Sequence, residues 1–299
     1  MKWLHPDVVR GLLAAETDCF RLAEARELRV EIFGRAALVS SMTTEPPGIV
    51  PEILARTEVL DLPIDRIFFR HLVHGPGKQD VPITLWQARD DAPISYTVRE
   101  GGVSFVTDFS LGYSCGLFLD QRANRRRLCE IRPQRVLNCF SYTCSFSVVG
   151  ATVGASTISV DVAKAALERG KANFAVNGLS LEGHRFLADD VFDVLPRLER
   201  RGERFDVIVL DPPTFSRGAK GRIFRAEDHY EKMVALACAI SAPGAHLLLS
   251  TNCTSLTPAR LRSFLPSSLP GKVETWSEPA LPDISSGGVS STLWVRIEG

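Results

Sequence analysis

The sequence lacks the features that mark several large classes of protein. It has no apolar run near the roughly 18 residues that a membrane-spanning helix needs. It has no excess of either charge, because 35 Lys and Arg residues balance 35 Asp and Glu residues. That balance argues against a surface coated in basic charge for nucleic acid. Its first residues, MKWLHPDVVRGLLAAETD, lack the apolar core and cleavage site of a signal peptide. We therefore expect a cytoplasmic protein without a membrane segment.

The seven cysteines also lack a pattern. Their number is odd, their spacing is irregular and no two form a CxxC pair. Neither a disulfide framework nor a metal site is therefore predicted. The remaining composition, with 45% hydrophobic and 23% charged residues, is normal for a folded protein of one large domain or two ordinary ones.

The first 97 residues mix helical and strand signals without a repeating rhythm. Pro6 is placed to begin a helix that runs to about Glu16, and a second helix is expected over about residues 50–56. Strand-like runs lie at residues 28–33, 37–41, 66–72 and 83–87, and the Gly- and Pro-rich residues 73–82 indicate a loop. We predict a small α+β domain over residues 1–97, with a role in substrate recognition.

From residue 98 onward, apolar strands alternate with helices. Runs typical of buried parallel strands lie at residues 135–139, 157–160, 207–210 and 246–250. Helical patterns lie between them, most clearly at 163–177 and 230–240, and one at 119–129 carries four arginines. This alternation predicts a doubly wound α/β domain over residues 98–299. Residues 265–288 predict a loop before a final hairpin. Ligands bind such sheets where the strands end.

Polar residues follow the first two of these strands, and two aspartates lie between the helix at 163–177 and the next strand. Asn138 ends the first strand and begins a turn whose backbone amides can approach a ligand. Asp161 follows the second, where a carboxylate can accept hydrogen bonds from both hydroxyls of a ribose. Asp189 and Asp190 supply an acceptor for an adenine amino group. One such aspartate alone would as readily be a helix cap or part of a turn, but three in register favour the ligand-binding interpretation.

The segment Asp211-Pro212-Pro213 is the most specific signal. Two consecutive prolines stiffen the backbone and remove two N–H donors. The Asp211 carboxylate and the carbonyls that follow it are then held where they can accept from an exocyclic amine. The alternative interpretation is a turn that simply ends the strand.

On these residues, the sequence resembles the S-adenosylmethionine-dependent methyltransferases that modify bases of large-subunit ribosomal RNA. The matching segments are GLFLDQRANRRR (116–127), VLNCFSYTCSFSV (136–148), SVDVAKAALERGKANFAVNGL (159–179), ADDVFDVL (188–195), FDVIVLDPPTFS (205–216) and LLLSTNCTS (247–255). The resemblance covers residues 98–299 well and the first hundred residues more weakly. It implies a Rossmann-like class I methyltransferase domain behind a small N-terminal α+β domain. Many members carry a further N-terminal RNA-binding PUA domain, which we do not expect here.

The resemblance also implies that S-adenosylmethionine is the cofactor and which residues bind it. They are Asn138, Phe140, Ser141, Tyr142, Thr143, Cys144, Ser145, Asp161, Val162, Asp189, Asp190, Val191, Asp211, Gln121 and Arg122. The turn 138–145 would line the methionine part, Asp161 would hold the ribose and Asp190 the adenine edge. Residues 211–213 would form the catalytic loop against the target base. The segment 120–122 would close over the cofactor, and the arginines near it would meet phosphate.

The sequence departs from the family at Cys144, where members usually have the glycine of a Tyr-Thr-Gly turn. Glycine lets the backbone approach the cofactor closely, so a Cβ here is expected to crowd the methionine or to force a different backbone angle. The segment GYSCG at 112–116 also lacks the Lys or Asp followed by Thr that we expect. A small-molecule methyltransferase on the same fold, or a protein that binds without catalysis, is therefore kept as an alternative.

Two target atoms are compatible with the sequence. Methylation of cytosine at C5 needs a thiolate that adds to C6, after which C5 attacks the methyl group and a base removes the C5 proton. Cys253 follows the last central strand, where relatives of this type place Ser-Cys-Ser. Guanine N7 has its own lone pair and needs only positioning, and Thr214-Phe215-Ser216 looks closer to that type. We place C5 slightly ahead of N7.

Substrate contacts are expected just after the Asp-Pro-Pro turn. Arg217, Lys220, Arg222 and Arg225 put four positive charges in nine residues, as in a loop that binds RNA phosphates. A solvated surface loop is the alternative. Phe215 is placed to stack on a base. The expected partner is ribosomal RNA, with a small molecule as the alternative substrate and a homodimer as an assembly to test.

Overall fold

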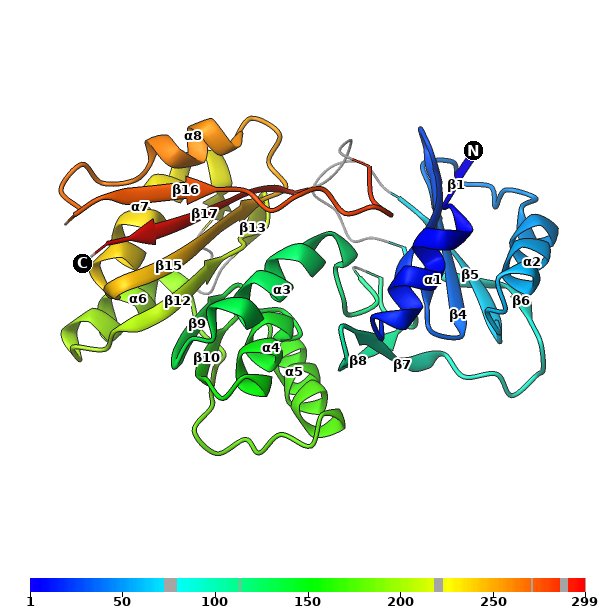
Figure 1. The fold of residues 1–299 in the computed structure, drawn as a ribbon, viewed down its shortest axis with the longest axis horizontal. Helices are drawn as coiled ribbons and strands as arrows, with labels where there is room; N and C mark the ends of the chain where they lie inside the picture. The colour runs from blue at the N-terminus through cyan, green and yellow to red at the C-terminus, as the bar shows by residue number, and fades with distance from the viewer. Residues whose placement is uncertain (73–79, 113, 218–222, 270, 286–289, 299) are drawn as a thin grey trace. The chain divides into compact units, whose positions relative to one another are not determined.

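The computed structural model describes residues 1–72, 80–112, 114–217, 223–269, 271–285 and 290–298 (Figure 1). The chain forms two compact units, of which unit 1 comprises residues 1–119 and 281–284 and unit 2 comprises residues 120–280 and 285–299. The predicted division after residue 97 falls inside strand β7 (Ser95–Glu100). Unit 1 extends further because β7 pairs with β8 (Val103–Asp108), and Phe109 beyond them stacks on Phe68 at 4.4 Å between ring centroids.

Unit 1 is built on a six-stranded sheet in the order β1–β2–β3–β4–β5–β6. The strands are β1 (Lys2–Trp3), β2 (Cys19–Ala25), β3 (Leu28–Phe33), β4 (Ala36–Ser41), β5 (Arg66–His71) and β6 (Ile83–Gln87). Only β4 and β5 are parallel neighbours, because helix α2 (Val50–Val59) connects them. Helices α1 (Pro6–Ala14) and α2 share an apolar core with one face of this sheet, where Val9 and Ile53 are fully buried.

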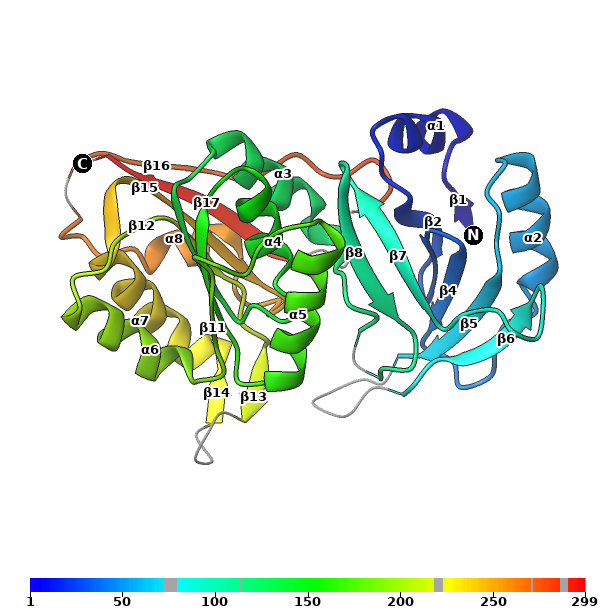
Figure 2. The same ribbon diagram turned by 90° about the horizontal axis from the view of Figure 1, so that it is seen from below.

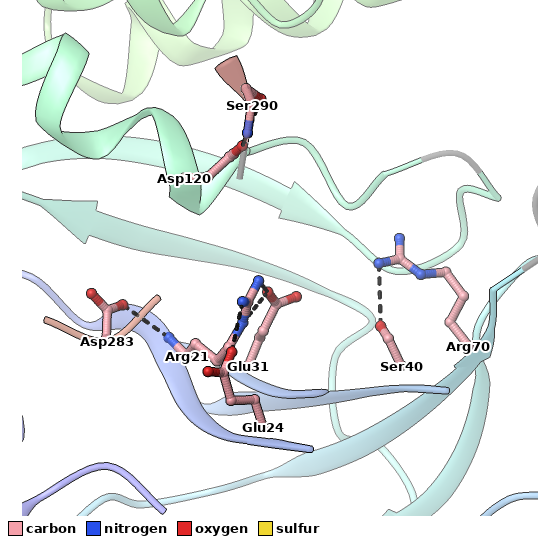
Figure 3. A network of polar contacts seen from close by, with 8 residues as sticks. All are labelled: Arg21, Glu24, Glu31, Ser40, Arg70, Asp120, Asp283 and Ser290. Carbon is pink, nitrogen blue, oxygen red and sulfur yellow. Dashed lines mark hydrogen bonds and ion pairs between the residues drawn. The ribbon is translucent and has the colours of Figure 1, made fainter. Parts of the chain in front are cut away.

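The other face of this sheet carries polar side chains. Successive strand residues point to opposite faces, so Arg21 and Glu31 face away from the apolar core that holds their neighbours Phe20 and Ile32. Arg21 is 5% exposed, and its guanidinium pairs with Glu24 at 3.1 Å and with Glu31 at 3.0 Å (Figure 3). The backbone N–H of Arg21 donates to Asp283 Oδ2 at 3.1 Å, which joins residues 281–284 to unit 1.

Unit 2 contains a seven-stranded sheet in the order β11–β10–β9–β12–β15–β17–β16. Its strands are β9 (Arg135–Cys139), β10 (Ser156–Val160), β11 (Arg185–Leu187), β12 (Phe205–Leu210), β15 (Ser241–Thr251), β16 (Val273–Trp276) and β17 (Ser291–Ile297). The first five strands in the sheet order are parallel, and β17 and β16 are antiparallel additions. Strand order reverses between β9 and β12, which is the switch point where ligands bind in sheets of this kind.

Helices cover both faces of this sheet (Figure 2). They are α3 (Arg122–Ile131), which follows the short 3₁₀ helix η1 (Leu119–Gln121), α4 (Ser145–Thr152), α5 (Lys164–Val176), α6 (Val191–Arg200), α7 (Ala226–Ala239) and α8 (Pro258–Ser263). Helices α6, α7 and α8 share the larger apolar core with one face. Helix α4 packs on the other face, since a Cβ at Gly150 would lie 3.1 Å from Val136 of β9.

The doubly wound α/β architecture predicted for the second part of the chain is confirmed, and its four predicted strands correspond to β9, β10, β12 and β15. The predicted loop at 265–288 is wrong in part, because β16 lies within it. All four side chains of this short edge strand are only partly buried, so its sequence VETW has no apolar run. No helix in the described part of the chain is long and apolar enough to cross a membrane.

Candidate active site

The turn after β9 has an unusual backbone. Phe140, Tyr142 and Cys144 adopt positive φ angles of 57°, 48° and 61°. A residue other than glycine that holds such an angle costs on the order of 1–3 kcal/mol, and such residues cluster at ligand sites. The turn is held by its own hydrogen bonds, because the N–H groups of Ser141, Tyr142 and Cys144 donate to Val160, Asp161 and Ser141. The turn predicted to line the methionine part of the cofactor therefore keeps a strained backbone that its neighbours fix in place.

Asp161 fixes this turn from the end of β10. Its Oδ2 accepts from the N–H of Tyr142 at 2.9 Å, and its Oδ1 accepts from the N–H of Ala163 at 2.8 Å. Burial raises the pKa of Asp161, while these two donors and the charge of Arg169 oppose that rise. Each oxygen retains a second lone pair, so the carboxylate can still accept from a ribose hydroxyl. Its predicted role toward the cofactor stays a prediction.

Cys144 is accommodated by a glycine on a neighbouring helix. Its side chain is fully buried, and a Cβ at Gly170 of α5 would lie 2.3 Å from its Sγ. The thiol thus fills space that Gly170 leaves open. The backbone at Cys144 stays in the left-handed region that glycine readily adopts. Burial raises the pKa of the Cys144 thiol to about 11, so we expect it to be unreactive at neutral pH.

Other predicted cofactor residues make structural contacts of their own. The amide of Asn138 donates to Ser147 Oγ at 3.0 Å, which ties β9 to α4. Asp190 is the N-cap of α6, because its Oδ1 accepts from the N–H of Phe192 at 2.9 Å. Asp189 pairs with Arg197 at 2.9 Å. Each aspartate therefore has a structural partner, and their predicted contact with adenine stays a prediction.

Asp211, at the end of β12, is the centre of a buried hydrogen-bond network. Ser250 Oγ donates to its Oδ1 at 2.6 Å, and Gln121 Nε2 contacts its Oδ2 at 3.3 Å. The same Gln121 amide donates to Ser250 Oγ at 2.8 Å. Behind it, Asn124 donates to Gln121 Oε1 at 2.8 Å, and the indole N–H of Trp294 donates to Asn124 at 2.9 Å. One chain of hydrogen bonds therefore joins η1, α3, β12, β15 and β17.

The Asp211 carboxyl is enclosed, although the residue as a whole is partly exposed. Burial raises its pKa to about 6, the negative charge of Asp120 adds to the rise, and the Ser250 hydrogen bond and the charge of Arg125 oppose it. A carboxyl with such a pKa changes protonation close to neutral pH. Buried groups of this kind, with a shifted pKa and specific polar partners, are typical of active sites.

The segment predicted to close over the cofactor is held in place by unit 2 itself. Asp120 Oδ2 accepts from Ser290 Oγ at 2.8 Å (Figure 3). The same hydroxyl contacts Asn252 at 2.8 Å. Arg122 is nine-tenths buried. The expectation that the arginines nearby meet phosphate is wrong for Arg125, because its side chain is 2% exposed and its guanidinium lies 5.9 Å from the Phe146 ring centroid.

Cys253 lies just past β15, beside Ser255 and the first turn of α7. Its Sγ is 3.2 Å from Ser255 Oγ and 3.7 Å from Glu227 Oε1. The Ser255 hydroxyl also donates to the same Glu227 oxygen. Cys253 is 6% exposed, whereas Glu227 is exposed. A thiol, a hydroxyl and a carboxylate thus meet near the carboxyl end of β15, the strand beside β12, and Asp211 follows β12.

The predicted substrate residues lie around a short hairpin after the Asp-Pro-Pro turn. Phe215 is half-buried at the start of β13 (Phe215–Arg217), and β13 pairs with β14 (Ile223–Arg225). Arg217 lies opposite Ile223 in the strand register of this hairpin. Arg225, opposite Phe215, is exposed. Lys220 and Arg222 lie outside the described residues. Pro212 is buried, and Pro213 is partly buried.

An aromatic cluster was missed by the sequence analysis. Phe224 of β14 lies 5.6 Å from Phe140, 6.0 Å from Phe192 and 5.6 Å from His229, measured between ring centroids. The base of the hairpin therefore packs on the turn after β9 and on the start of α6. Phe140 and Phe192 were visible within the family segments, but no local pattern shows which aromatic residue joins them. Ser250, Asn124 and Trp294 in the Asp211 network were missed for the same reason.

Comparisons with known proteins identify the family of this chain. The model of the family described as S-adenosylmethionine-dependent methyltransferase matches residues 70–285. Ribosomal RNA large subunit methyltransferase I of Aeromonas salmonicida is 38% identical over 161 residues, which are 53% of this chain and 40% of the relative. The protein of the same name from Salmonella arizonae is 34% identical over 233 residues, 77% of this chain and 53% of the relative. The chain thus spans about half the length of these relatives.

A solved structure shares the fold. The crystal structure of the SAM-dependent methyltransferase from Agrobacterium tumefaciens matches with a TM-score of 0.73 and 24% identity, over 94% of this chain and 90% of that one. This likeness concerns the arrangement of strands and helices. It agrees with the Rossmann-like α/β fold of this chain.

Proposed function

Because this chain belongs to the family of S-adenosylmethionine-dependent methyltransferases, we propose that it transfers the methyl group of S-adenosylmethionine to a base of ribosomal RNA. The observation that carries this proposal is the Asp211-Pro212-Pro213 turn at the switch point of the sheet, held by Ser250 and Gln121. It stands in a chain whose relatives are named as ribosomal RNA methyltransferases. Ribosomal RNA is proposed as the substrate of this chain because of that likeness.

S-adenosylmethionine is the cofactor of this family, and the residues after the parallel strands fit it. The turn at 140–144 holds three residues at positive φ angles, as backbones at ligand sites often do. Asp161 has acceptor capacity left for the ribose hydroxyls, and the apolar side chain of Val162 beside it is 49% exposed. We assign the methionine part to the turn, the ribose to Asp161 and the adenine edge to Asp190. When bound, the cofactor supplies an electrophilic methyl group.

We assign cytosine C5 as the target ahead of guanine N7. Cys253 supports this choice because it follows β15, and Asp211 follows the neighbouring strand β12. C5 is a weak nucleophile until a thiolate adds to C6, whereas N7 needs only to be placed against the methyl group. The Asp211 turn would then hold the base by accepting from its exocyclic amine. Unit 1 and the hairpin that carries Arg217 and Arg225 would contact the RNA.

One labelling experiment tests the function. The protein is incubated with methyl-labelled S-adenosylmethionine and unmodified ribosomal RNA, and the RNA is digested to nucleosides for mass spectrometry. We expect label in 5-methylcytidine. Label in 7-methylguanosine keeps the fold and the cofactor but removes the role of Cys253. Label that goes only to a metabolite extract rejects the RNA substrate, and no label with no binding of S-adenosylmethionine in calorimetry rejects the enzyme.

Two variants separate binding from chemistry. Asp161→Ala removes the proposed acceptor for the ribose and should weaken S-adenosylmethionine binding by about tenfold or more, because a hydrogen-bonded charged group contributes about 1.5–3 kcal/mol. Cys253→Ala should abolish C5 methylation and leave cofactor affinity nearly unchanged. If Cys253→Ala still produces 5-methylcytidine, the nucleophile assignment is wrong.

A further inference from the structure

Glu227 is the acidic residue that contacts the Cys253 thiol. It lies in the first turn of α7, and its Oε1 is 3.7 Å from Cys253 Sγ. Ser255 lies beside both groups, because its Oγ is 3.2 Å from the sulfur and donates to the same Glu227 oxygen. The carboxylate therefore has one hydrogen-bond donor that holds it and one sulfur within reach. The sequence alone predicts no role for Glu227, because no local pattern links residue 227 to residue 253.

Methylation at C5 requires a base at two points. The thiol must lose its proton before the sulfur can add to C6, and C5 must lose its proton after it has accepted the methyl group. C5 is bonded to C6, so its proton lies close to the sulfur that C6 carries. A base within hydrogen-bond reach of the sulfur is thus placed for both steps. Of the acidic groups in the described chain, Glu227 is the one that contacts Cys253.

We propose that Glu227 is the general base of this methyl transfer and that Ser255 is a positioning residue that holds its carboxylate toward Cys253. This inference rests on the proposed function and deepens its C5 route. The carboxylate of Glu227 is exposed, so it can reach both the sulfur and the solvent that must finally receive a proton.

The steps balance as follows. Glu227 takes the Cys253 proton and passes it to water, the sulfur forms a bond to C6, and the electron pair of the C5–C6 double bond moves into the ring, where N3 takes a proton from water. C5 then forms a bond to the methyl carbon as the bond from that carbon to sulfonium breaks, releasing S-adenosylhomocysteine. Glu227 next removes the C5 proton, the double bond forms again and Cys253 leaves as thiolate. Cys253 recovers its proton from Glu227, and N3 releases one proton to water.

The test is the fate of the covalent adduct in Glu227→Gln. Without a base the C5 proton stays, so the methylated base remains bound to Cys253. We expect release of 5-methylcytidine to slow by about 10²–10⁴-fold, with a protein–RNA adduct that carries the methyl label and survives a denaturing gel. The assay is run at neutral pH and also at about pH 9, where a thiol ionises without a base. Cofactor affinity measured by calorimetry reports that the variant is folded.

Matched controls use residues of the same region. Asp228→Asn changes the next acidic residue of the same helix turn and should turn over at the wild-type rate without an adduct. Glu227→Gln combined with Cys253→Ala should form no adduct. Ser255→Ala should slow release by about tenfold, through the loss of one hydrogen bond to a charged group, and Ser255→Thr should restore the rate.

Two results overturn the proposal. One is a Glu227→Gln variant that releases 5-methylcytidine at the wild-type rate. The other is a variant that binds the cofactor but forms neither product nor adduct at about pH 9. If the wild-type protein itself makes no 5-methylcytidine, it is the C5 route of the proposed function that has failed, and that outcome is recognised before any variant is made.

Discussion

In unit 1 the buried Arg21 and its partner Glu31 lie within strands, whereas in unit 2 Asp161 and Asp211 lie just after strands end. Arg21 and Glu31 face each other on neighbouring strands β2 and β3, and Arg21 pairs with both Glu31 and Glu24. In unit 2, Asp161 follows β10, and Asp211 follows β12. Both sets are hydrogen-bonded, as buried polar groups must be, but they differ in what surrounds them.

The difference distinguishes groups that stabilise the fold, such as the Arg21 cluster, from groups that are placed to bind a ligand, such as Asp161 and Asp211. The Arg21 cluster uses ion pairs to satisfy its own charges on a sheet face. The groups in unit 2 retain acceptor capacity at the edge of a parallel sheet, where an α/β fold binds its ligand. Changes in the first set should therefore lower stability and leave cofactor binding alone. Changes in the second set should alter binding, chemistry or the pH dependence of stability.

Arg21→Met should give the largest loss of stability. It removes the guanidinium that pairs with the carboxylates of Glu24 and Glu31, which are mostly buried. Removing one member of a buried pair costs about 3–5 kcal/mol. Denaturant unfolding followed by fluorescence should show this loss, and calorimetry should show unchanged affinity for S-adenosylmethionine in the remaining folded protein.

The control for this variant is Arg10→Met, which breaks an exposed pair with Asp7. Pairs at the surface contribute about 0–1 kcal/mol, so this variant should unfold almost as the wild type does. Equal losses of stability in the two variants would show that the Arg21 ion pairs contribute no more than an exposed pair. A loss of cofactor affinity in Arg21→Met would show that its cluster is not separate from the site in unit 2.

Asp211→Asn should change how stability depends on pH. The folded-state pKa of Asp211 is about 6 against an ordinary value of 3.8, so the folded protein holds this proton more tightly than the unfolded chain does. The stability from that proton is fully present below about pH 4 and is lost as the pH rises to about 6. The gap is about two pKa units, at about 1.4 kcal/mol each, or about 3 kcal/mol in all.

Asparagine does not titrate, so this part of the pH dependence should disappear in the variant. The difference in free energy of unfolding between the wild type and Asp211→Asn should therefore change by up to about 3 kcal/mol between pH 4 and pH 7. Asp228→Asn, which changes an exposed carboxylate, should give a curve parallel to the wild type. A parallel curve for Asp211→Asn as well would mean that the Asp211 carboxyl is not enclosed.

The strand ends of unit 2 were predictable because a buried parallel strand is an apolar run that stops at a turn. Asp161 and Asp211 could be placed from that pattern alone. The partners of Asp211 could not, because Gln121 lies 90 residues away in the chain and Trp294 lies 170 residues from Asn124. Such contacts depend on the packing of the whole sheet, which no local pattern carries.

Unit 1 was less predictable for a related reason. Strand β2 reads CFRLAEA, with a charge at its centre, and this breaks the apolar run that indicates a buried strand. The charge is tolerated only because Glu31 lies on the next strand and Glu24 lies further along the same one. The turn after β9 gives a parallel case. The sequence shows that Cys144 replaces the usual glycine, but it does not show that Gly170 makes room for it.

Gly170→Ala should destabilise unit 2 by about 1–3 kcal/mol, as overpacking of a core does. A Cβ at this position would lie 2.3 Å from Cys144 Sγ and 2.9 Å from the Cys144 Cβ. The matched control is Gly11→Ala in α1 of unit 1, where nothing lies within 4 Å of the new Cβ. That variant should be more stable by about 0.5–1 kcal/mol, because alanine favours a helix over glycine. Stabilisation by both variants would refute the packing of Cys144 against Gly170.

Cys144→Gly should have the smallest effect, because two changes oppose each other. Glycine relieves a residue held at φ 61°, which is worth about 1 kcal/mol, and it removes a buried side chain that contributes about the same through packing. We expect a net change below about 1 kcal/mol in the free energy of unfolding and almost none in cofactor affinity. The informative comparison is the double variant with Gly170→Ala, where the new methyl group would enter the space that Sγ has left. If Gly170→Ala is destabilising alone but stabilising in the Cys144→Gly protein, the two positions form one packing unit, and the cysteine in the cofactor turn is compensated from α5. If its effect is the same in both proteins, Cys144 acts on the cofactor turn directly, and S-adenosylmethionine affinity should then rise in Cys144→Gly.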